Sequence, residues 1–263
     1  MPPLTDLEIE RLASDIQKTL LATRFACSSL MRITGGSTSY TFRGLLQMPL
    51  AVFDRKPTTT VIVKKATDHA AINTDFALDS SRSRHGSGLT YFPTYEDEML
   101  RALQYSKLNV KADPIPVTVP KIIYYDPRAR VQVIEDLQPA VDLASILTGK
   151  AKVNVQEYAT VGIDIGNWLR RFHIWTQGPT QTGLRRTIAL NTSSQDLKWR
   201  TTYDTIVETV KAFPAISQEN MGILQAVRAR ALNEHEQHAQ LSSDDSLFGK
   251  DCGLVHADFW TGK

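Results

Sequence analysis

The pattern of hydrophobic and polar positions begins with an amphipathic segment. Residues 5–23 (TDLEIERLASDIQKTLLAT) carry apolar side chains at helical spacing, at Leu7, Ile9, Leu12, Ile16 and Leu20. Glu8 follows Thr5 by three residues, a spacing that is typical of a capping box at the start of a helix. We therefore predict a helix that begins after Thr5 and has one apolar face.

Three strand-like runs follow this helix. They are residues 29–34 (SLMRIT), 39–46 (SYTFRGLL) and 58–66 (TTTVIVKKA). The β-branched content of the third run is typical of a strand. A short segment that contains Gly35 and Gly36 connects the first two runs, and we expect a tight turn there. The polar residues 67–93 predict a loop.

The middle of the chain predicts one more helix and a hairpin. Residues 94–108 (TYEDEMLRALQYSKL) have a helical pattern, and Thr94 can cap that helix. The apolar runs 121–126 (KIIYYD) and 130–137 (RVQVIEDL) bracket Asp126-Pro127-Arg128. Because these residues favour a turn, the two runs predict a β-hairpin.

After Leu137 the pattern changes from strands to helices. We predict helices at residues 140–147, at 155–176, and near 196–213 and 217–240, and a short buried strand at 252–255. The longest helix has one apolar face, formed by Tyr158, Val161, Ile165, Leu169 and Phe172. The chain therefore predicts an α+β protein, with a mostly β part, a hairpin hinge and a mostly α part.

Composition and charge narrow the class of protein. Hydrophobic residues make up 42% of the 263 residues and charged residues 22%, as in an ordinary globular protein. The net charge of +2 is too small to indicate a nucleic-acid or membrane partner. Cys27 and Cys252 are far apart in the sequence, and the N-terminus has neither the basic nor the apolar part of a signal peptide. We expect a cytoplasmic protein.

The candidate chemistry begins with glycines and lysines on neighbouring strands. Gly35 and Gly36 would let backbone N–H groups approach a phosphate, although a glycine pair between strands is often only a turn. Lys64 or Lys65 could neutralise phosphate groups from a strand, although both could be solvated. Alternation puts the two lysines on opposite faces, and periodicity does not choose between them.

Acidic residues supply the remaining candidates. Glu96 could pair with the strand lysine, although Asp97 and Glu98 compete with it, and an acidic first turn also simply complements the helix dipole. In LVHADFWTGK, Asp258 could accept the proton of an attacking hydroxyl, and His256 could hold the loop by hydrogen bonding. These features occur in the order that phosphoryl transfer from ATP requires. His235 and His238 do not match HExxH, and no metal ligand is assigned.

At these residues the chain resembles the aminoglycoside phosphotransferase and choline-kinase-like family, which has a protein-kinase-like fold, and above all its fungal phosphotransferase branch. LVHADFWTGK is similar to the family's H-G-D-x-x-x-x-N loop, and LMRITGGSTSYTFRGLL to its nucleotide-covering strand pair. VIVKKA resembles its lysine strand, YEDEML its E-x-x-x-L helix, VIEDL its adenine-binding hinge, and IGNWLRRFHIWT the core helix of its C-terminal lobe.

The resemblance assigns roles to individual residues. It selects Lys64 as the phosphate-binding lysine and Glu96 as its partner. It makes Asp258 the catalytic base and His256 the residue that orients the loop. The remaining nucleotide-binding positions that it implies are Gly35, Gly36 and Ser37, and the hinge backbone of Glu135, Asp136 and Leu137. ATP and Mg²⁺ are the implied cofactors, and a nucleotide and a small-molecule acceptor are the implied partners.

The chain departs from the family pattern at the end of the final motif. Ala257 replaces the usual glycine, and Lys263 stands where the family has a metal-binding asparagine. An ammonium group cannot coordinate Mg²⁺. The family's second metal carboxylate and its acceptor-pocket helices would follow Lys263. We therefore expect little or no kinase activity from these 263 residues.

The same departure leads to an expectation about association. Without the segment that the family has next, the apolar residues of the final motif should lack packing partners and form an exposed surface. These residues are Leu254, Val255, Phe259 and Trp260. Self-association through that surface is therefore expected.

These inferences predict a two-lobed, protein-kinase-like α+β fold. Residues 1–137 would form the N-terminal lobe and hinge, and residues 138–263 an incomplete helical C-terminal lobe. The predicted function is ATP-dependent phosphorylation of a hydroxyl on a small molecule that the sequence does not identify, impaired by truncation. The alternative is a non-catalytic, degenerate kinase-like protein that binds a nucleotide or a partner, or is inactive.

Overall fold

The structure is a computed structural model. It describes residues 4–34, 39–51, 57–69, 71, 95–106, 108, 117–141, 143–148, 155–240 and 254. These residues fall into two compact units, one within Met1–Phe172 and the other within His173–Asp258. The predicted lobe boundary at Leu137 stays a prediction.

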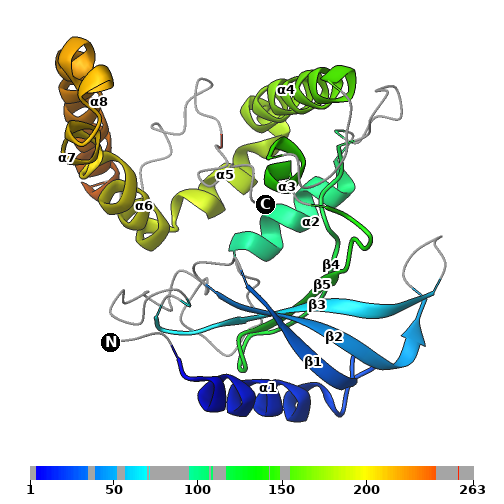
Figure 1. The fold of residues 1–263 in the computed structure, drawn as a ribbon. Coiled ribbons are helices and arrows are strands. Elements are labelled where there is room, and N and C mark those ends of the chain that lie inside the picture. The colour runs from blue at the N-terminus through cyan, green and yellow to red at the C-terminus, as the bar shows by residue number, and fades with distance from the viewer. Residues whose placement is uncertain are drawn as a thin grey trace. The chain divides into compact units, whose positions relative to one another are not determined.

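The first unit is built on an antiparallel sheet (Figure 1). Its five strands have the order β1-β2-β3-β5-β4, and every neighbouring pair is antiparallel. The strands are β1 (Cys27–Ile33), β2 (Ser39–Leu50), β3 (Thr58–Ala66), β4 (Ile122–Asp126) and β5 (Val131–Glu135). All three predicted strand runs and the predicted hairpin are confirmed. β2 continues past the predicted end at residue 46, with an irregular register between Leu45 and Leu50.

Helix α1 (Asp6–Leu20) begins as predicted. Thr5 Oγ1 accepts a hydrogen bond from the Glu8 N–H, and Glu8 Oε2 accepts one from the Thr5 N–H at 2.8 Å. The capping box is therefore confirmed. Ile9, Ile16 and Leu20 are buried, but the Leu7 side chain is 57% exposed. Including Leu7 in the apolar face was wrong, because two residues turn the helix by about 200° and Leu7 lies opposite Ile9.

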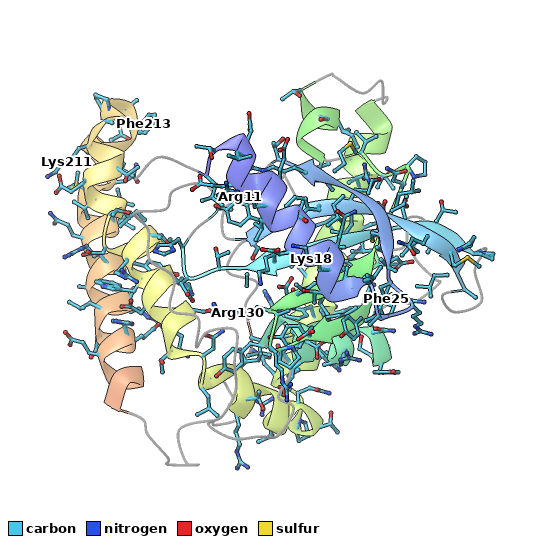
Figure 2. The ribbon with its side chains drawn as sticks, turned by 90° about the horizontal axis from the view of Figure 1, so that it is seen from below. Arg11, Lys18, Phe25, Arg130, Lys211 and Phe213 are labelled. Atoms are coloured by element: carbon cyan, nitrogen blue, oxygen red, sulfur yellow. The ribbon has the colours of Figure 1, made fainter. Side chains whose placement is uncertain are left out.

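The core of the first unit lies between α1 and one face of the sheet. Figure 2, seen from the α1 side, shows this helix, marked by Arg11 and Lys18, in front of the strands. The buried sheet residues on this face include Phe42, Val61, Val63, Val131 and Val133. Side chains alternate along a strand. Arg43, Ile62 and Lys64 therefore belong to the opposite face, which we call the open face of the sheet.

The helices of the first unit follow the predicted pattern. They are α2 (Tyr95–Tyr105), α3 (Leu143–Leu147) and α4 (Val155–Gln177), which continues into the second unit. The predicted cap Thr94 lies outside the described residues. On α4, Trp168 and Phe172 are buried and their rings stack with centroids 5.5 Å apart. Val161, Ile165 and Leu169 are half-buried, whereas Asp164 is buried, so the most buried side of α4 only partly coincides with the predicted apolar face.

The second unit is helical, and here the predicted boundaries were partly wrong. It contains α5 (Thr182–Ala189), α6 (Thr192–Lys198), a π-helical segment (Trp199–Tyr203), α7 (Ile206–Lys211) and α8 (Pro214–Gln240). The continuous helix predicted near 196–213 is interrupted at Asp204 and Thr205. At this break Asp204 forms an ion pair with Arg228 of α8 at 2.6 Å, and its carbonyl accepts a hydrogen bond from Arg228 Nε at 3.3 Å. α5 was not predicted.

The observed fold agrees with the predicted class at a coarse level. The described residues form a mixed α and β structure with an antiparallel five-stranded sheet, which is consistent with a kinase-like α+β fold. The two-lobed arrangement stays a prediction. Among the described residues, no helix combines the length and the hydrophobicity that crossing a bilayer would require.

Candidate functional site

Lys64 and Glu96 form an ion pair on the open face of the sheet. Lys64 lies near the end of β3, and Glu96 lies in the acidic first turn of α2. The Lys64 Nζ is 2.6 Å from Glu96 Oε1. The side chains are 27% and 47% exposed, so water can reach both groups. The structure thus brings together two side chains that are separated by 32 residues.

The neighbouring Lys65 has a different environment. Its ammonium donates a hydrogen bond to the carbonyl of Ala129, in the turn between β4 and β5. Burial lowers the pKa of Lys65, and the charge of the Arg130 guanidinium lowers it further. The Lys65 ammonium therefore already has a hydrogen-bond partner, on the face of the sheet that packs against α1. The two lysines thus have different partners, Glu96 for Lys64 and the Ala129 carbonyl for Lys65, and the role of Lys64 in phosphate binding stays a prediction.

The three acidic residues at the start of α2 also differ from one another. Asp97 is fully buried and pairs with Arg101 Nε at 2.8 Å, one turn later in the same helix. Glu98 is half-buried, and its charge contributes to the raised pKa of Tyr95 after the larger effect of burial. Glu96, by contrast, forms the ion pair with Lys64.

The backbone at the predicted hinge is held by two hydrogen bonds. The Glu135 N–H donates to the Lys121 carbonyl at 2.8 Å, so it belongs to the sheet. The Leu137 carbonyl accepts from the Ala140 N–H at 2.9 Å, which closes a turn. Within the described part of the chain, the Leu137 N–H and the Asp136 carbonyl form no backbone hydrogen bond.

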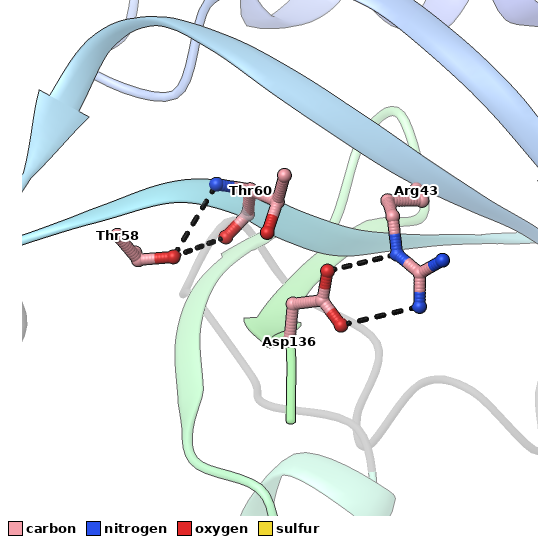
Figure 3. Close-up of polar contacts among 4 residues, drawn as sticks. All are labelled: Arg43, Thr58, Thr60 and Asp136. Atoms are coloured by element: carbon pink, nitrogen blue, oxygen red, sulfur yellow. Dashed lines mark hydrogen bonds and ion pairs between the residues drawn. The ribbon is translucent and has the colours of Figure 1, made fainter. Parts of the chain in front are cut away.

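The Asp136 side chain has a partner that the sequence analysis missed. Arg43 on β2 contacts it through two bonds, Nε to Oδ2 at 2.8 Å and Nη2 to Oδ1 at 3.4 Å (Figure 3). The Asp136 side chain is only 3% exposed and that of Arg43 is 29% exposed. The alternation along β2 puts Arg43 on the open face with Lys64. That pattern was a usable signal, but it could not identify a partner 93 residues away.

The remaining predicted site residues lie outside the described residues. These are Gly35, Gly36, Ser37, His256 and Asp258. Of the apolar residues expected to form an exposed surface, only Leu254 is described, and its N–H donates to Thr176 Oγ1 at 3.3 Å. The roles predicted for the five site residues and for the apolar surface stay predictions.

The described part of the site holds a cation paired with a carboxylate. Lys64 supplies a cation on the open face, held by a carboxylate. Among the residues that the structure describes, no three His, Cys, Asp or Glu side chains gather as a metal site would require.

Comparison with known proteins supports a phosphotransferase-like protein. The chain is 27% identical over 261 residues to phosphotransferase FrzJ of Cladobotryum sp, a match that covers 98% of this chain and 64% of the relative. It is 24% identical over 148 residues to a 4-hydroxytryptamine kinase of Psilocybe cyanescens, covering 56% of this chain and 37% of that protein. The matches thus span less than two thirds of either relative. No family model matches the chain.

Proposed function

We propose that this chain is part of an ATP-dependent phosphotransferase that acts on a hydroxyl group of a small molecule. The observation that carries the proposal is the 2.6 Å ion pair between Lys64 on β3 and Glu96 on α2. A lysine held by a helix carboxylate beside a sheet is suited to neutralise the phosphates of a nucleotide. The two relatives support the same reaction class, and one of them is named for a small hydroxylated amine.

The adenine base would bind at the end of β5. In this proposal the Leu137 N–H donates a hydrogen bond to an acceptor nitrogen of the base. The Glu135 N–H would not bond to the base, because it already donates to the Lys121 carbonyl at 2.8 Å. Glu135 would instead place the following residues beside the base. The backbone of Gly35, Gly36 and Ser37 would cover the phosphates. ATP and Mg²⁺ are proposed as cofactors, the metal on the strength of the family resemblance alone.

The proposed reaction gives Asp258 the role of base. The acceptor oxygen forms a bond to the γ-phosphorus, while the bond from that phosphorus to the β–γ bridging oxygen breaks and ADP leaves. The hydroxyl proton moves to the Asp258 carboxylate, and His256 orients the loop that carries it. Lys64 neutralises charge on the phosphates, and Glu96 holds the Lys64 ammonium in place.

Adjacent lysines provide the test of the nucleotide site. We expect Lys64→Met to weaken ATP binding about 10- to 100-fold, because it removes a charge-assisted contact to phosphate. Lys65→Met is the matched control, since Lys65 bonds to Ala129 on the other face of the sheet. Isothermal titration with ATP, with circular dichroism to verify folding, measures both effects. Equal ATP affinity in the two variants would show that Lys64 does not bind phosphate.

A second candidate is a nucleotide-binding protein without turnover. Lys263, at the position where the family has a metal-binding asparagine, favours this candidate. The deciding measurement is transfer of labelled γ-phosphate from ATP to hydroxylated small molecules. Transfer that Asp258→Asn abolishes while ATP affinity is preserved supports the phosphotransferase. ATP binding without any transfer supports the second candidate.

A further inference from the structure

Arg43 contacts the segment after β5 on both sides of Leu137. Its Nε and Nη2 donate to the two oxygens of Asp136, at 2.8 and 3.4 Å. When the Gln138 carboxamide is oriented with its oxygen toward Arg43, that oxygen lies 2.8 Å from Nε and Nη1 and 3.1 Å from Nη2, so it contacts the face of the positively charged guanidinium. One guanidinium therefore holds the side chains that precede and follow Leu137.

The backbone hydrogen bonds that hold this segment are at its two ends, Glu135 and Leu137. The sheet holds it at the Glu135 N–H, and the turn holds it at the Leu137 carbonyl. The Leu137 side chain is 39% exposed, so packing constrains it weakly. The orientation of the peptide groups between Asp136 and Gln138 thus depends on the two side chains that Arg43 holds.

The chemistry of the contact suits positioning. A guanidinium is a rigid, planar group that can donate to both oxygens of a carboxylate in a fixed geometry, which an ammonium cannot do. The Asp136 carboxylate is 3% exposed, so its contact with Arg43 is shielded from water and from salt. Arg43 lies on a central part of β2, opposite Ile62 of β3, and is itself held by the sheet.

We infer that Arg43 is a positioning residue that fixes Asp136 and Gln138 so that the backbone at Leu137 is presented to the nucleobase. This inference rests on the proposed function, because it assumes that the segment binds the base of ATP. Arg43 acts on the base through the segment and does not touch the phosphates. Its loss should therefore weaken recognition of the base and spare recognition of the phosphates.

The experiment compares ATP with inorganic tripolyphosphate, which has the phosphates without the base. Both ligands are titrated at one fixed Mg²⁺ concentration into the wild type, Arg43→Lys and Arg43→Met. Because Arg43→Met leaves the Asp136 charge buried and unpaired, it can fail to fold. The double variant Arg43→Met/Asp136→Leu removes both charges, a replacement that folded proteins often tolerate.

The expected result is a loss of affinity for ATP without a loss of affinity for tripolyphosphate. The double variant should bind ATP about 10-fold more weakly, the effect of one or two misplaced hydrogen bonds, while its tripolyphosphate affinity stays unchanged. Arg43→Lys, which keeps the charge but not the planar fork, should lie between it and the wild type. Arg200→Met is the control, since Arg200 Nε contacts Asp196 Oδ2 at the same 2.8 Å but both side chains are about half exposed.

Two kinds of failure can be told apart. If the wild type binds ATP and the double variant keeps the same ratio of ATP to tripolyphosphate affinity, whether both affinities fall or neither does, Arg43 has no positioning role. The proposed function then stands. If the wild type binds neither ligand, the nucleotide site itself is refuted, and the role of Arg43 with it.

Discussion

At the scale of single residues, a buried thiol and two adjacent lysines show how strongly position controls chemistry. Lys64 pairs with Glu96 at 2.6 Å, while Lys65 bonds to a backbone carbonyl on the other face of the same strand. The two side chains have the same composition and neighbouring positions. Because a strand turns successive side chains to opposite faces, only Lys64 is available to the proposed nucleotide site.

Cys27 gives a prediction about pH. Burial raises the pKa of its thiol from 9.0 to about 11. The folded protein therefore keeps the proton between these two values while the unfolded chain loses it, so stability falls as pH rises from 9 to 11. Each pKa unit corresponds to about 1.4 kcal/mol. We expect the stability advantage of the wild type over Cys27→Ala to shrink by about 2 kcal/mol across this range.

Urea unfolding of both proteins at several pH values measures this difference. The buried tyrosine Tyr40, whose pKa burial also raises, is present in both proteins, so its contribution cancels. A difference in unfolding free energy that stays constant from pH 9 to 11 would contradict the prediction.

At the scale of elements, β1 and β2 approach each other closely at Gly44. A Cβ atom at this position would lie 2.6 Å from Cys27 Sγ and 3.2 Å from Leu30 Cδ2. We expect Gly44→Ala to destabilise the protein by about 1 to 3 kcal/mol, because the extra methyl group overpacks a filled core. Adding Cys27→Ala removes the sulfur and should recover part of this loss, which a double-mutant cycle of unfolding free energies measures.

The control for this prediction is a glycine with free space around it. A Cβ atom at Gly162 in α4 would meet nothing within 4 Å. Gly162→Ala should therefore stabilise the protein by about 0.5 to 1 kcal/mol through the higher helix propensity of alanine. If Gly44→Ala proves as harmless as Gly162→Ala, the close approach of the two strands is not a constraint on the fold.

At the scale of the whole molecule, the two units should respond differently to nucleotide. The contacts that carry the proposed site all lie within Met1–Phe172. We expect ATP to slow hydrogen exchange in β2, β3, α2 and residues 131–140, because ligand binding suppresses local opening. Exchange in α7 and α8 should stay unchanged. Mass spectrometry of peptic peptides with and without ATP measures this, and protection confined to α7 and α8 would contradict the proposed site.

Much of the first unit could be predicted from local patterns. The capping box of Thr5 and Glu8, the β-branched run of β3 and the turn between β4 and β5 each depend on residues within a few positions of one another. The second unit was harder. The interruption at Asp204 involves Arg228, which lies 24 residues later, and α8 begins at Pro214, a residue tolerated in the first turn of a helix. Neither the break at Asp204 nor the start of α8 at Pro214 follows from the spacing of apolar residues along the chain.

The sequence by itself determined the reaction class to propose, the order of the elements in the sheet-forming part and the candidates Lys64 and Glu96. Only the tertiary structure decided the partners of these side chains. Lys64, and not Lys65, forms the ion pair with Glu96. Asp97 pairs with Arg101, and Asp136 pairs with Arg43. The physical reason is distance along the chain. Periodicity reports which face a side chain takes, but a partner 32 or 93 residues away is chosen by how the elements pack.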